Sequence, residues 1–464
     1  MRGLGLRRSG EPGLPSRRML LHMLAAAGTM GTAAAVAGGA ANDPPPNPLL
    51  AALKTKAAAV RSLAFADDDF ADLEPLGAAV GTARIVQLGE PSHGAGSAFA
   101  AKARIVKFLH LRHGFDVLVW ESGFYDVALA QAAMDSPSIG AAAAARKGIF
   151  ALWSDAAEVK PLFAYIKASQ SRLHPLDIAG FDLQVTADGS RARFAQDLLA
   201  YAGALDDPAV RERAVALANA VLRARAGLYA SKFSDVRDLE HLTAAANALR
   251  DLATARPVAF EAVHGELDSA FMGRALENAR ADAALRFDMA RSPETTPARE
   301  SGRDARNAAN LRWLIEERYR GRKILVWAHN VHVMDAYYAP GFRALHLEER
   351  PGDMKPTGVF MKNWFGDAVY TIGITAFEGE EGFATGGPKS PIAPAPPGSL
   401  EAGLHALGHP FAFLDFRAIP RGSSPLRSRL ALRAPKFDTN EVADAGRIYD
   451  GVFFIDRMAA ATHI

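Results

Sequence analysis

The chain has 464 residues, 49% of them apolar, which is enough to bury a large core in one to three domains. Lysine and arginine (53) nearly balance aspartate and glutamate (51), so no strong electrostatic field would attract an anionic membrane, and nucleic acid is not an expected partner. The absence of cysteine excludes disulfides, thiolate nucleophiles and cysteine-based zinc or iron–sulfur sites.

Residues 1–41 have the pattern of an export signal. The stretch SRRMLL (16–21) resembles the twin-arginine pattern, and a short Ala/Gly-rich apolar stretch that ends in small residues follows it. An N-terminal membrane anchor is the alternative, but the apolar stretch is short and contains His22. We therefore expect the mature chain to begin near Asn42, to carry no membrane span, and to be located in the periplasm or outside the cell.

After a leader and a first helix (42–82), short apolar runs alternate with helical patterns. Continuous apolar runs are typical of strands in a sheet that is covered on both faces. We expect an α/β fold with a mostly parallel central sheet, built from residues 83–190 and 321–464, with helices on both faces and a large helical insertion beside a deep active-site cleft. The predicted strands are residues 83–90, 116–122, 176–182, 323–330, 368–377, 411–416 and 451–457.

The segments between the strands are mainly helical. The first two strands flank a helical pattern with Ser97 as its expected N-cap and Gly114 just past its end, which makes a βαβ unit. Residues 191–320 form long amphipathic segments with helical period and almost no strand signal, and we expect them to be the insertion, as a lid or one wall of the cleft. Residues 378–399 are rich in glycine and proline and are expected to form a loop.

Four of the predicted strands end in an ionisable side chain, namely Glu90, Glu121, Asp182 and His329. Ligands bind outside the carboxyl ends of the strands in open parallel α/β sheets, so these side chains should converge on one crevice. Taken singly, each residue could be a helix N-cap or a solvated turn residue. Their recurrence at four strand ends favours a shared site.

His93 follows Glu90 in the stretch QLGEPSHGAG (87–96), whose glycines allow the backbone to turn tightly and to approach a ligand closely. A neutral imidazole can take a proton from water, and a nearby carboxylate would hold it in one tautomer. Glu90 or Glu121 is the expected orienting partner. The alternative is a turn histidine that is merely exposed to solvent.

The stretch WAHNVH places His329 and His332 three residues apart at a strand end. His329 could bind a substrate carbonyl, donate to a leaving oxygen or stabilise an oxyanion, with His332 as support. Lys102 and Arg104, on the helix after His93, could supply positive charge to an anionic intermediate or be ordinary surface charges. Two histidines and two glutamates also suit zinc or manganese, so a metal site stays open. The motifs G-x-S-x-G, H-E-x-x-H and Walker A are absent, which disfavours a serine-triad hydrolase.

Six stretches together resemble the erythromycin esterase family, and they cover the chain from about residue 83 to residue 457. In chain order they are GEPSHGAGSAFAAKARIVKFL, VLVWESGFYD, IAGFDLQ, RDARNAANLRWL, ILVWAHNVHV and YDGVFFIDR. The resemblance implies an α/β core with a large helical portion around a deep cleft, and hydrolysis of the lactone ester of macrolide antibiotics. It is weakest in the helical insertion.

Where the motifs match, the resemblance implies catalytic roles for four residues. His93 corresponds to the general base that activates water, Glu90 and Glu121 to essential acidic residues, and His329 to a second essential histidine. Lys102 stands where the family commonly has arginine, and lysine cannot make the same planar, bidentate contact. This departure affects the expectation of a macrolide substrate more than that of hydrolysis. Contacts with the substrate are expected from Lys102, Arg104, Asp182 and His332.

Three functions follow from these patterns. The first is an exported hydrolase of a small-molecule ester or lactone that needs no metal and no cofactor. The second is a metal-dependent hydrolase with Glu90, His93, Glu121 and His329 as ligands. The third is an exported module that binds haem or another ligand, because the family's fold resembles that of bacterial haem-binding lipoproteins. The sequence singles out no haem ligand and indicates no oligomeric state, and its acidic and histidine residues disfavour a purely structural role.

Overall fold

The computed structural model describes residues 47–187, 190–223, 236–262, 265–291, 297–339, 344–433, 436–437 and 441–464. The predicted export signal (1–41) lies outside these residues. The described elements belong to one compact unit, Pro46–Ile464. None of the helices described there is long and apolar enough to cross a membrane.

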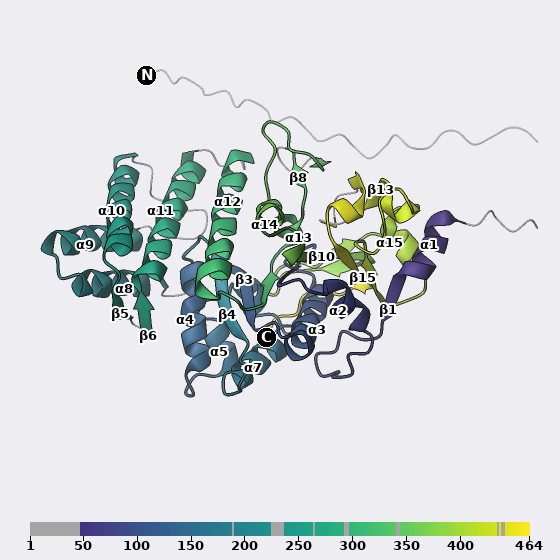
Figure 1. The fold of residues 1–464 in the computed structure, drawn as a ribbon, viewed down its shortest axis with the longest axis horizontal. Coiled ribbons are helices and arrows are strands. Elements are labelled where there is room, and N and C mark those ends of the chain that lie inside the picture. The colour runs from purple at the N-terminus through teal and green to yellow at the C-terminus, as the bar shows by residue number, and fades with distance from the viewer. Residues whose placement is uncertain are drawn as a thin grey trace, which may run out of the picture. The chain divides into compact units, whose positions relative to one another are not determined.

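A nine-stranded sheet forms the centre of the described unit (Figure 1). Its order is β1-β12-β15-β10-β2-β7-β3-β4, and β11 pairs with β10 outside this path. Neighbours from β15 to β4 are parallel, whereas β1, β12 and β11 pair antiparallel, so the expected mostly parallel sheet is confirmed. The strands are β1 Ala57–Val60, β2 Ile85–Leu88, β3 Val117–Gly123, β4 Asp177–Asp182, β7 Ile324–Trp327, β10 Val369–Glu381, β11 Ser390–Ile392, β12 Phe411–Asp415 and β15 Gly451–Met458.

Helices cover both faces of this sheet, which explains why the strands are continuous apolar runs. On one face, side chains such as Leu118 and Trp120 of β3 share a core with α2 (Glu74–Val80), α3 (Gly96–His113) and α7 (Lys160–Ser169). Successive residues of a strand point to opposite faces. Every residue of β3 is therefore buried by one layer of helices or the other.

The opposite face carries two further cores. Val117 and Val119 of β3 share one core with α11 (Ser269–Arg291), α12 (Pro297–Trp313) and α14 (Thr357–Phe365). The strands β12 and β15 share the other core with three shorter helices, α1 Pro48–Lys56, α13 Asn330–Val333 and α15 Leu400–His405. Both faces are thus closed to solvent over most of the sheet.

The helical insertion lies between β4 and β7, as expected, and its helix α12 packs against β4 (Figure 1). It begins with α8 (Ser190–Ala204), α9 (Pro208–Arg223) and α10 (Val236–Ala255), which precede α11 and α12. The sequence of this insertion has almost no strand signal, and the structure adds one antiparallel hairpin of β5 (Ala259–Ala262) and β6 (Gly265–Asp268). Each strand has only four residues, too few to show a period. Residues 224–235 and 292–296 lie outside the described part.

The loop predicted for residues 378–399 is wrong in part. Strand β10 continues to Glu381, and β11 pairs with its end on one side while β15 pairs with it on the other. Gly379 allows this close pairing, because its φ is 134° and a Cβ there would lie 2.1 Å from the carbonyl oxygen of Met458. Glycine is typical of loops, but Gly379 allows β10 to pair closely with Met458 of β15.

Helix α3 begins at Gly96, so the prediction of Ser97 as its N-cap is wrong. The hydroxyl of Ser97 accepts a hydrogen bond from the backbone N–H of Ala459 instead (2.9 Å). Gly114 follows the helix at φ 68°, as expected for a left-handed C-terminal cap.

Residues 459–464 run beside the loop that carries His93. The N–H of Ala461 donates to the carbonyl of Gly94 (2.9 Å), and the N–H of Ile464 donates to the carbonyl of Asp155 (3.0 Å). This segment therefore connects the loop after β2 with the loop around residue 155. The remaining described elements are α4 Phe124–Asp135, α5 Ala141–Ala145, α6 Ala151–Ser154, β8 Tyr337–Tyr338, β9 Leu345–His346, β13 Leu430–Leu432, β14 Glu441–Ala443, the π-helix η1 Leu314–Arg318 and the 3-10 helices η3 Gly366–Ala368, η4 Pro425–Arg427 and η5 Ala445–Arg447.

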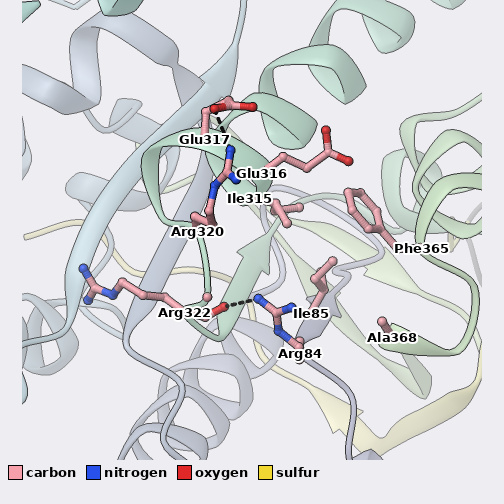
Figure 2. Close-up of a pocket in the computed structure, with 10 residues that line it drawn as sticks. Arg84, Ile85, Ile315, Glu316, Glu317, Arg320, Arg322, Phe365 and Ala368 are labelled. Atoms are coloured by element: carbon pink, nitrogen blue, oxygen red, sulfur yellow. Dashed lines mark hydrogen bonds and ion pairs between the residues drawn. The ribbon is translucent and has the colours of Figure 1, made fainter.

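A pocket of about 520 Å³ lies at the edge of the sheet where β2, β7 and β10 begin (Figure 2). Its lining includes Arg84, Arg322 and Ala368, which come just before these three strands, together with Phe365 of α14. The predicted site residues do not line this pocket. The predicted strand-end residues Glu90, Glu121, Asp182 and His329 lie at the opposite, carboxyl edge.

Candidate active site

Glu90 is the centre of the first group of predicted residues. It lies two residues past the end of β2, and its side chain is fully buried. Its Oε1 accepts hydrogen bonds from Trp153 Nε1 (2.9 Å) and faces His93 Nδ1 (3.1 Å). Its Oε2 accepts a hydrogen bond from Lys102 Nζ. Both carboxylate oxygens are therefore held by donors from three different segments.

His93 is the most accessible member of this group. Its side chain is 26% exposed, whereas that of Glu90 is 0% exposed. Its ring packs edge-on against the rings of Trp153 and His329, with centroids 5.3 Å and 5.1 Å away. With Nδ1 donating to the Glu90 carboxylate, Nε2 is the nitrogen that can accept a proton from water. Of the two glutamates expected to orient this ring, the structure selects Glu90.

The glycines around His93 allow close backbone contacts. A Cβ at Gly89 would lie 2.0 Å from Asn330 Oδ1, and a Cβ at Gly94 would lie 2.8 Å from the backbone nitrogen of Gly382. The loop is thus packed against the segment after β7 and the segment after β10. Larger residues at either position would move His93.

Lys102 lies on the face of α3 that points toward Glu90, and its side chain is fully buried. The alternative that Lys102 is an ordinary surface charge is therefore wrong. Its Nζ also donates to the carbonyl of Ala328 (3.1 Å) and lies 4.3 Å from the ring centroid of Trp327. Burial lowers the pKa of Lys102 to about 8, although the charge of Glu90 opposes this shift. Lys102 therefore contacts the site through Glu90.

The structure does not bring Arg104 into this group. Its guanidinium forms hydrogen bonds with both carboxylate oxygens of Asp72 (2.9 and 2.8 Å) and with the carbonyls of Ser62 and Asp69 (both 2.8 Å). The side chain is 1% exposed. Arg104 fixes the segment before α2 against α3.

Glu121 is the centre of a second buried group. It lies within β3, and its Oε2 accepts a hydrogen bond from the backbone N–H of His329 (2.8 Å). Its Oε1 faces His332 Nε2 at 3.3 Å and Arg303 Nη2 at 3.7 Å. Arg303 also pairs with Asp182, the last residue of β4. Arginine thus links two of the predicted strand-end carboxylates.

Asp182 receives several donors. Besides Arg303, it accepts hydrogen bonds from Asn307 Nδ2 (3.3 Å) and from the N–H of Gln184 (2.9 Å). Burial alone would raise the pKa of Asp182, but Arg303 and these hydrogen bonds outweigh burial and lower it. Asp182 is therefore held as a carboxylate that fixes Arg303.

His332 lies between two carboxylates. Its Nε2 faces Glu121 and its Nδ1 faces Asp304 Oδ1 at 2.8 Å, while the same oxygen of Asp304 accepts hydrogen bonds from the hydroxyl and the N–H of Thr357. Burial alone would lower the pKa of His332, but the charges of Asp304 and Glu121 outweigh it and raise the pKa to about 9. His332 is thus an imidazolium at neutral pH.

His329 is neutral. Burial and the positive charges of neighbouring groups, including His332 and Lys102, lower its pKa well below the usual value. Its Nε2 donates to the carbonyl of Pro91 (3.1 Å), and its Nδ1 accepts from the N–H of Val331 (3.1 Å). Both ring nitrogens are therefore used to hold the His93 loop against the end of β7. Its predicted contact with a substrate would require the ring to release one of these partners.

Four members of the two groups were not predicted as site residues, namely Trp153, Arg303, Asp304 and Asn307. Arg303, Asn307 and Asn310 lie on one face of α12 at spacings of four and three, and this buried face carries polar side chains. Buried helix faces are normally apolar, so this stripe was a usable signal in the sequence. The sequence gives no such signal for Trp153, because a tryptophan in an apolar stretch is usually an ordinary core residue.

The metal alternative finds no support in this geometry. Among the residues that the structure describes, no group of three or more histidine, aspartate or glutamate side chains is placed to hold a metal ion. Glu90 and Glu121 instead face lysine, arginine, tryptophan and histidine donors. The depth of the expected cleft above these residues stays a prediction.

A buried carboxylate that faces a partly exposed imidazole at the carboxyl edge of a mostly parallel sheet defines an α/β protein with a glutamate–histidine site where such sheets bind ligands. The family model described as erythromycin esterase matches residues 110–458, and the chain belongs to this family. Glu90, His93, Lys102 and Arg104 come before the matched residues, so their roles depend on the geometry above.

A sequence relative and two solved structures agree with this assignment. The "Putative hydrolase YbfO" of Bacillus subtilis (strain 168) is 27% identical over 355 residues, which cover 72% of this chain and 74% of that protein. A succinoglycan biosynthesis protein has a TM-score of 0.70 at 17% identity and covers 89% of this chain and 97% of its own. A mutant of the erythromycin esterase EreC in its open conformation has a TM-score of 0.62 at 16% identity, and the match covers 87% of this chain and 98% of the EreC chain. The structures show the same fold, and the family and the relative support a hydrolase.

Proposed function

We propose that this chain hydrolyses a carboxylic ester or lactone with a water molecule activated by His93. The observation that carries the proposal is the Glu90–His93 pair, in which a buried carboxylate holds Nδ1 of an imidazole that is itself 26% exposed. This arrangement leaves Nε2 available as a base, and the carboxylate stabilises the imidazolium that forms. Lys102 is paired with the other carboxylate oxygen of Glu90.

The reaction needs no covalent intermediate and no cofactor. His93 Nε2 takes one proton from water as the oxygen adds to the ester carbonyl carbon, which gives a tetrahedral oxyanion. When the bond from carbon to the leaving oxygen breaks, the same imidazolium returns the proton to that oxygen.

The proposed substrate class is a small-molecule ester, with macrolide lactones as one member to be tested. The name of the family and the structural relative EreC, an erythromycin esterase, support macrolides as substrates, and through them a role in the response to antibiotics. Turnover of simple esters without turnover of macrolides would keep the chemistry and remove the antibiotic role.

A substitution of His93 tests the proposal directly. We expect His93→Gln to lower kcat for a hydrolysed ester by at least about 100-fold, because the general base is lost, while the melting temperature stays near that of the parent. The chain from residue 42 is suitable, since it contains the whole compact unit Pro46–Ile464. His174→Gln, on the exposed segment between α7 and β4, is the matched control.

Two results would contradict different parts of the proposal. Full turnover by His93→Gln would remove His93 as the base. No turnover of any member of an ester and macrolide panel by the parent chain would remove the ester assignment.

We also propose export through the twin-arginine pattern at residues 16–21, which would place the folded hydrolase in the periplasm or outside the cell.

A further inference from the structure

We propose that Trp153 is a positioning residue for the Glu90–His93 pair, which rests on the proposed role of His93. Trp153 lies on α6, 60 residues after His93 in the chain, and its side chain is fully buried. Its indole N–H donates to the same carboxylate oxygen that faces His93. The feature that matters is this one N–H group rather than the volume of the ring.

Oxygen Oε1 of Glu90 has two donors that come from different segments of the chain. Trp153 Nε1 is 2.9 Å away and His93 Nδ1 is 3.1 Å away, and the planes of the two rings are 88° apart. Because Lys102 holds the other oxygen, the indole bond prevents the carboxylate from rotating about its own axis. Oε1 then stays directed at His93 while the imidazole charge changes during a reaction.

Trp153 is itself held in place by its surroundings. Its ring stacks on Phe150 with an interplanar angle of 9°, and the N–H of Phe150 donates to the hydroxyl of Ser122 at the end of β3 (3.1 Å). Residues just after α6 are bound by the segment 459–464, through the N–H of Ile464 on the carbonyl of Asp155. The donor is thus fixed relative to the sheet, as a positioning group must be.

A purely structural role is the competing explanation, and the molecule contains a suitable comparison. Trp120 is also fully buried and its ring lies 6.2 Å from that of Trp153, but its indole N–H has no hydrogen-bond partner among the described residues. Replacement of either tryptophan by phenylalanine removes the same atoms from the same core. Only the change at Trp153 removes a hydrogen bond to Glu90.

The kinetic test compares Trp153→Phe with Trp120→Phe. We expect Trp153→Phe to lower kcat for a hydrolysed ester by roughly 10- to 100-fold with KM changed by less than about threefold, because a misplaced base slows the chemical step. The pH profile of kcat/KM should change as well, since His93 is then the only donor that faces Oε1. Trp120→Phe should lower the melting temperature about as much as Trp153→Phe does, while kcat and the pH profile stay those of the parent chain. Equal effects of both substitutions on kcat would overturn the proposal.

A second measurement does not depend on turnover. In the full chain, the indole N–H resonance of Trp153, assigned by its loss in Trp153→Phe, should lie downfield and move upfield in Glu90→Gln, while the Trp120 resonance stays in place. A Trp153 resonance that does not respond to Glu90→Gln would overturn the proposal, whatever the activity. If the resonance responds but the parent chain turns over no ester, the proposed function fails and the contact between Trp153 and Glu90 stands.

Discussion

Charges of opposite sign alternate through the group around Glu121. Asp304 faces His332, His332 faces Glu121, and Arg303 connects Glu121 with Asp182. An unpaired charge in such a buried place would cost several kcal/mol, so each member depends on its neighbours to remain charged. Loss of one member should therefore change how the other members bind protons.

His332 makes this dependence measurable through pH. Its pKa of about 9 in the folded chain lies above the value near 6.5 of an unfolded histidine, so the folded chain binds the extra proton more tightly. The stabilisation that comes from protonation of His332 is fully present below about pH 6.5 and is lost as the pH rises through about 9. We expect the free energy of unfolding of the parent chain, minus that of His332→Gln, to fall by about 3 kcal/mol between pH 6 and pH 10.

Chemical denaturation of both proteins at a series of pH values would provide this comparison. The other titrating groups are present in both proteins, so the difference reports on His332 and on the carboxylates that face it. A difference that does not change with pH would mean that the pKa of His332 is the same in the folded and unfolded chains. A difference that rises with pH would mean that folding lowers this pKa, which would contradict the charged His332.

The positions of the strand-end residues could be predicted because the carboxyl ends of parallel strands meet at one edge. The contacts of Lys102 and Arg104 could not be predicted. The two residues are separated by two positions on α3, or about 200° around the helix axis, so only one can point toward Glu90. Which one does so depends on how α3 packs on the sheet. The orientation of His329 also depended on local backbone groups, namely the carbonyl of Pro91 and the N–H of Val331.

The loop between β2 and α3 is the element on which the proposed base depends. It is held by backbone contacts on both sides, since the carbonyl of Gly94 accepts hydrogen bonds from the N–H groups of Gly382 (3.0 Å) and Ala461 (2.9 Å). These two donors come from the segment after β10 and the segment after β15. The geometry of His93 is therefore set by segments far from it in sequence.

An alanine at position 94 tests this dependence. Its Cβ would lie 2.8 Å from the nitrogen and 2.9 Å from the carbonyl carbon of Gly382, so the loop must move away from β10. We expect Gly94→Ala to destabilise the fold by about 1–3 kcal/mol and to lower kcat for a hydrolysed ester. Thermal denaturation and steady-state kinetics would measure the two effects.

Gly140→Ala is the matched control for this substitution. A Cβ at Gly140 meets no atom within 4 Å, and its φ of −69° is open to any residue. We expect this variant to keep both stability and activity. Equal behaviour of the two variants would show that the loop tolerates movement without loss of the base.

The seven apolar runs predicted as strands are strands in the structure, and even β2 and β7, with four residues each, are buried at every position. The missed strands β1, β5, β6 and β11 are as short, and β1 and β11 are only partly buried, so they carry little apolar pattern. They become strands only because a partner lies beside them. Tertiary pairing of this kind is not encoded in the local sequence.

The proposed export depends on residues outside the compact unit. The chain has a second arginine pair, Arg7 and Arg8, that lacks the following apolar residues of Arg17 and Arg18. We expect the double substitution Arg17→Lys, Arg18→Lys to retain the unprocessed chain inside a bacterial host that has a twin-arginine route. The double substitution Arg7→Lys, Arg8→Lys should leave export unchanged. Fractionation of cells that express each variant, followed by immunoblotting, would separate these outcomes, and export of both variants would exclude the twin-arginine route.

The strand order also determines when the site can form during synthesis. Strand β2, which precedes Glu90, pairs with β7 and β10, and both of these strands come more than 230 residues later in the chain. At translation rates of about 5–20 residues per second, β2 waits roughly 10 to 50 s for its first neighbour. During this time both edges of an apolar strand lack partners, which is the condition that favours wrong pairing. The topology that brings Glu90 and His329 together thus delays the completed site until the final third of the chain has been made.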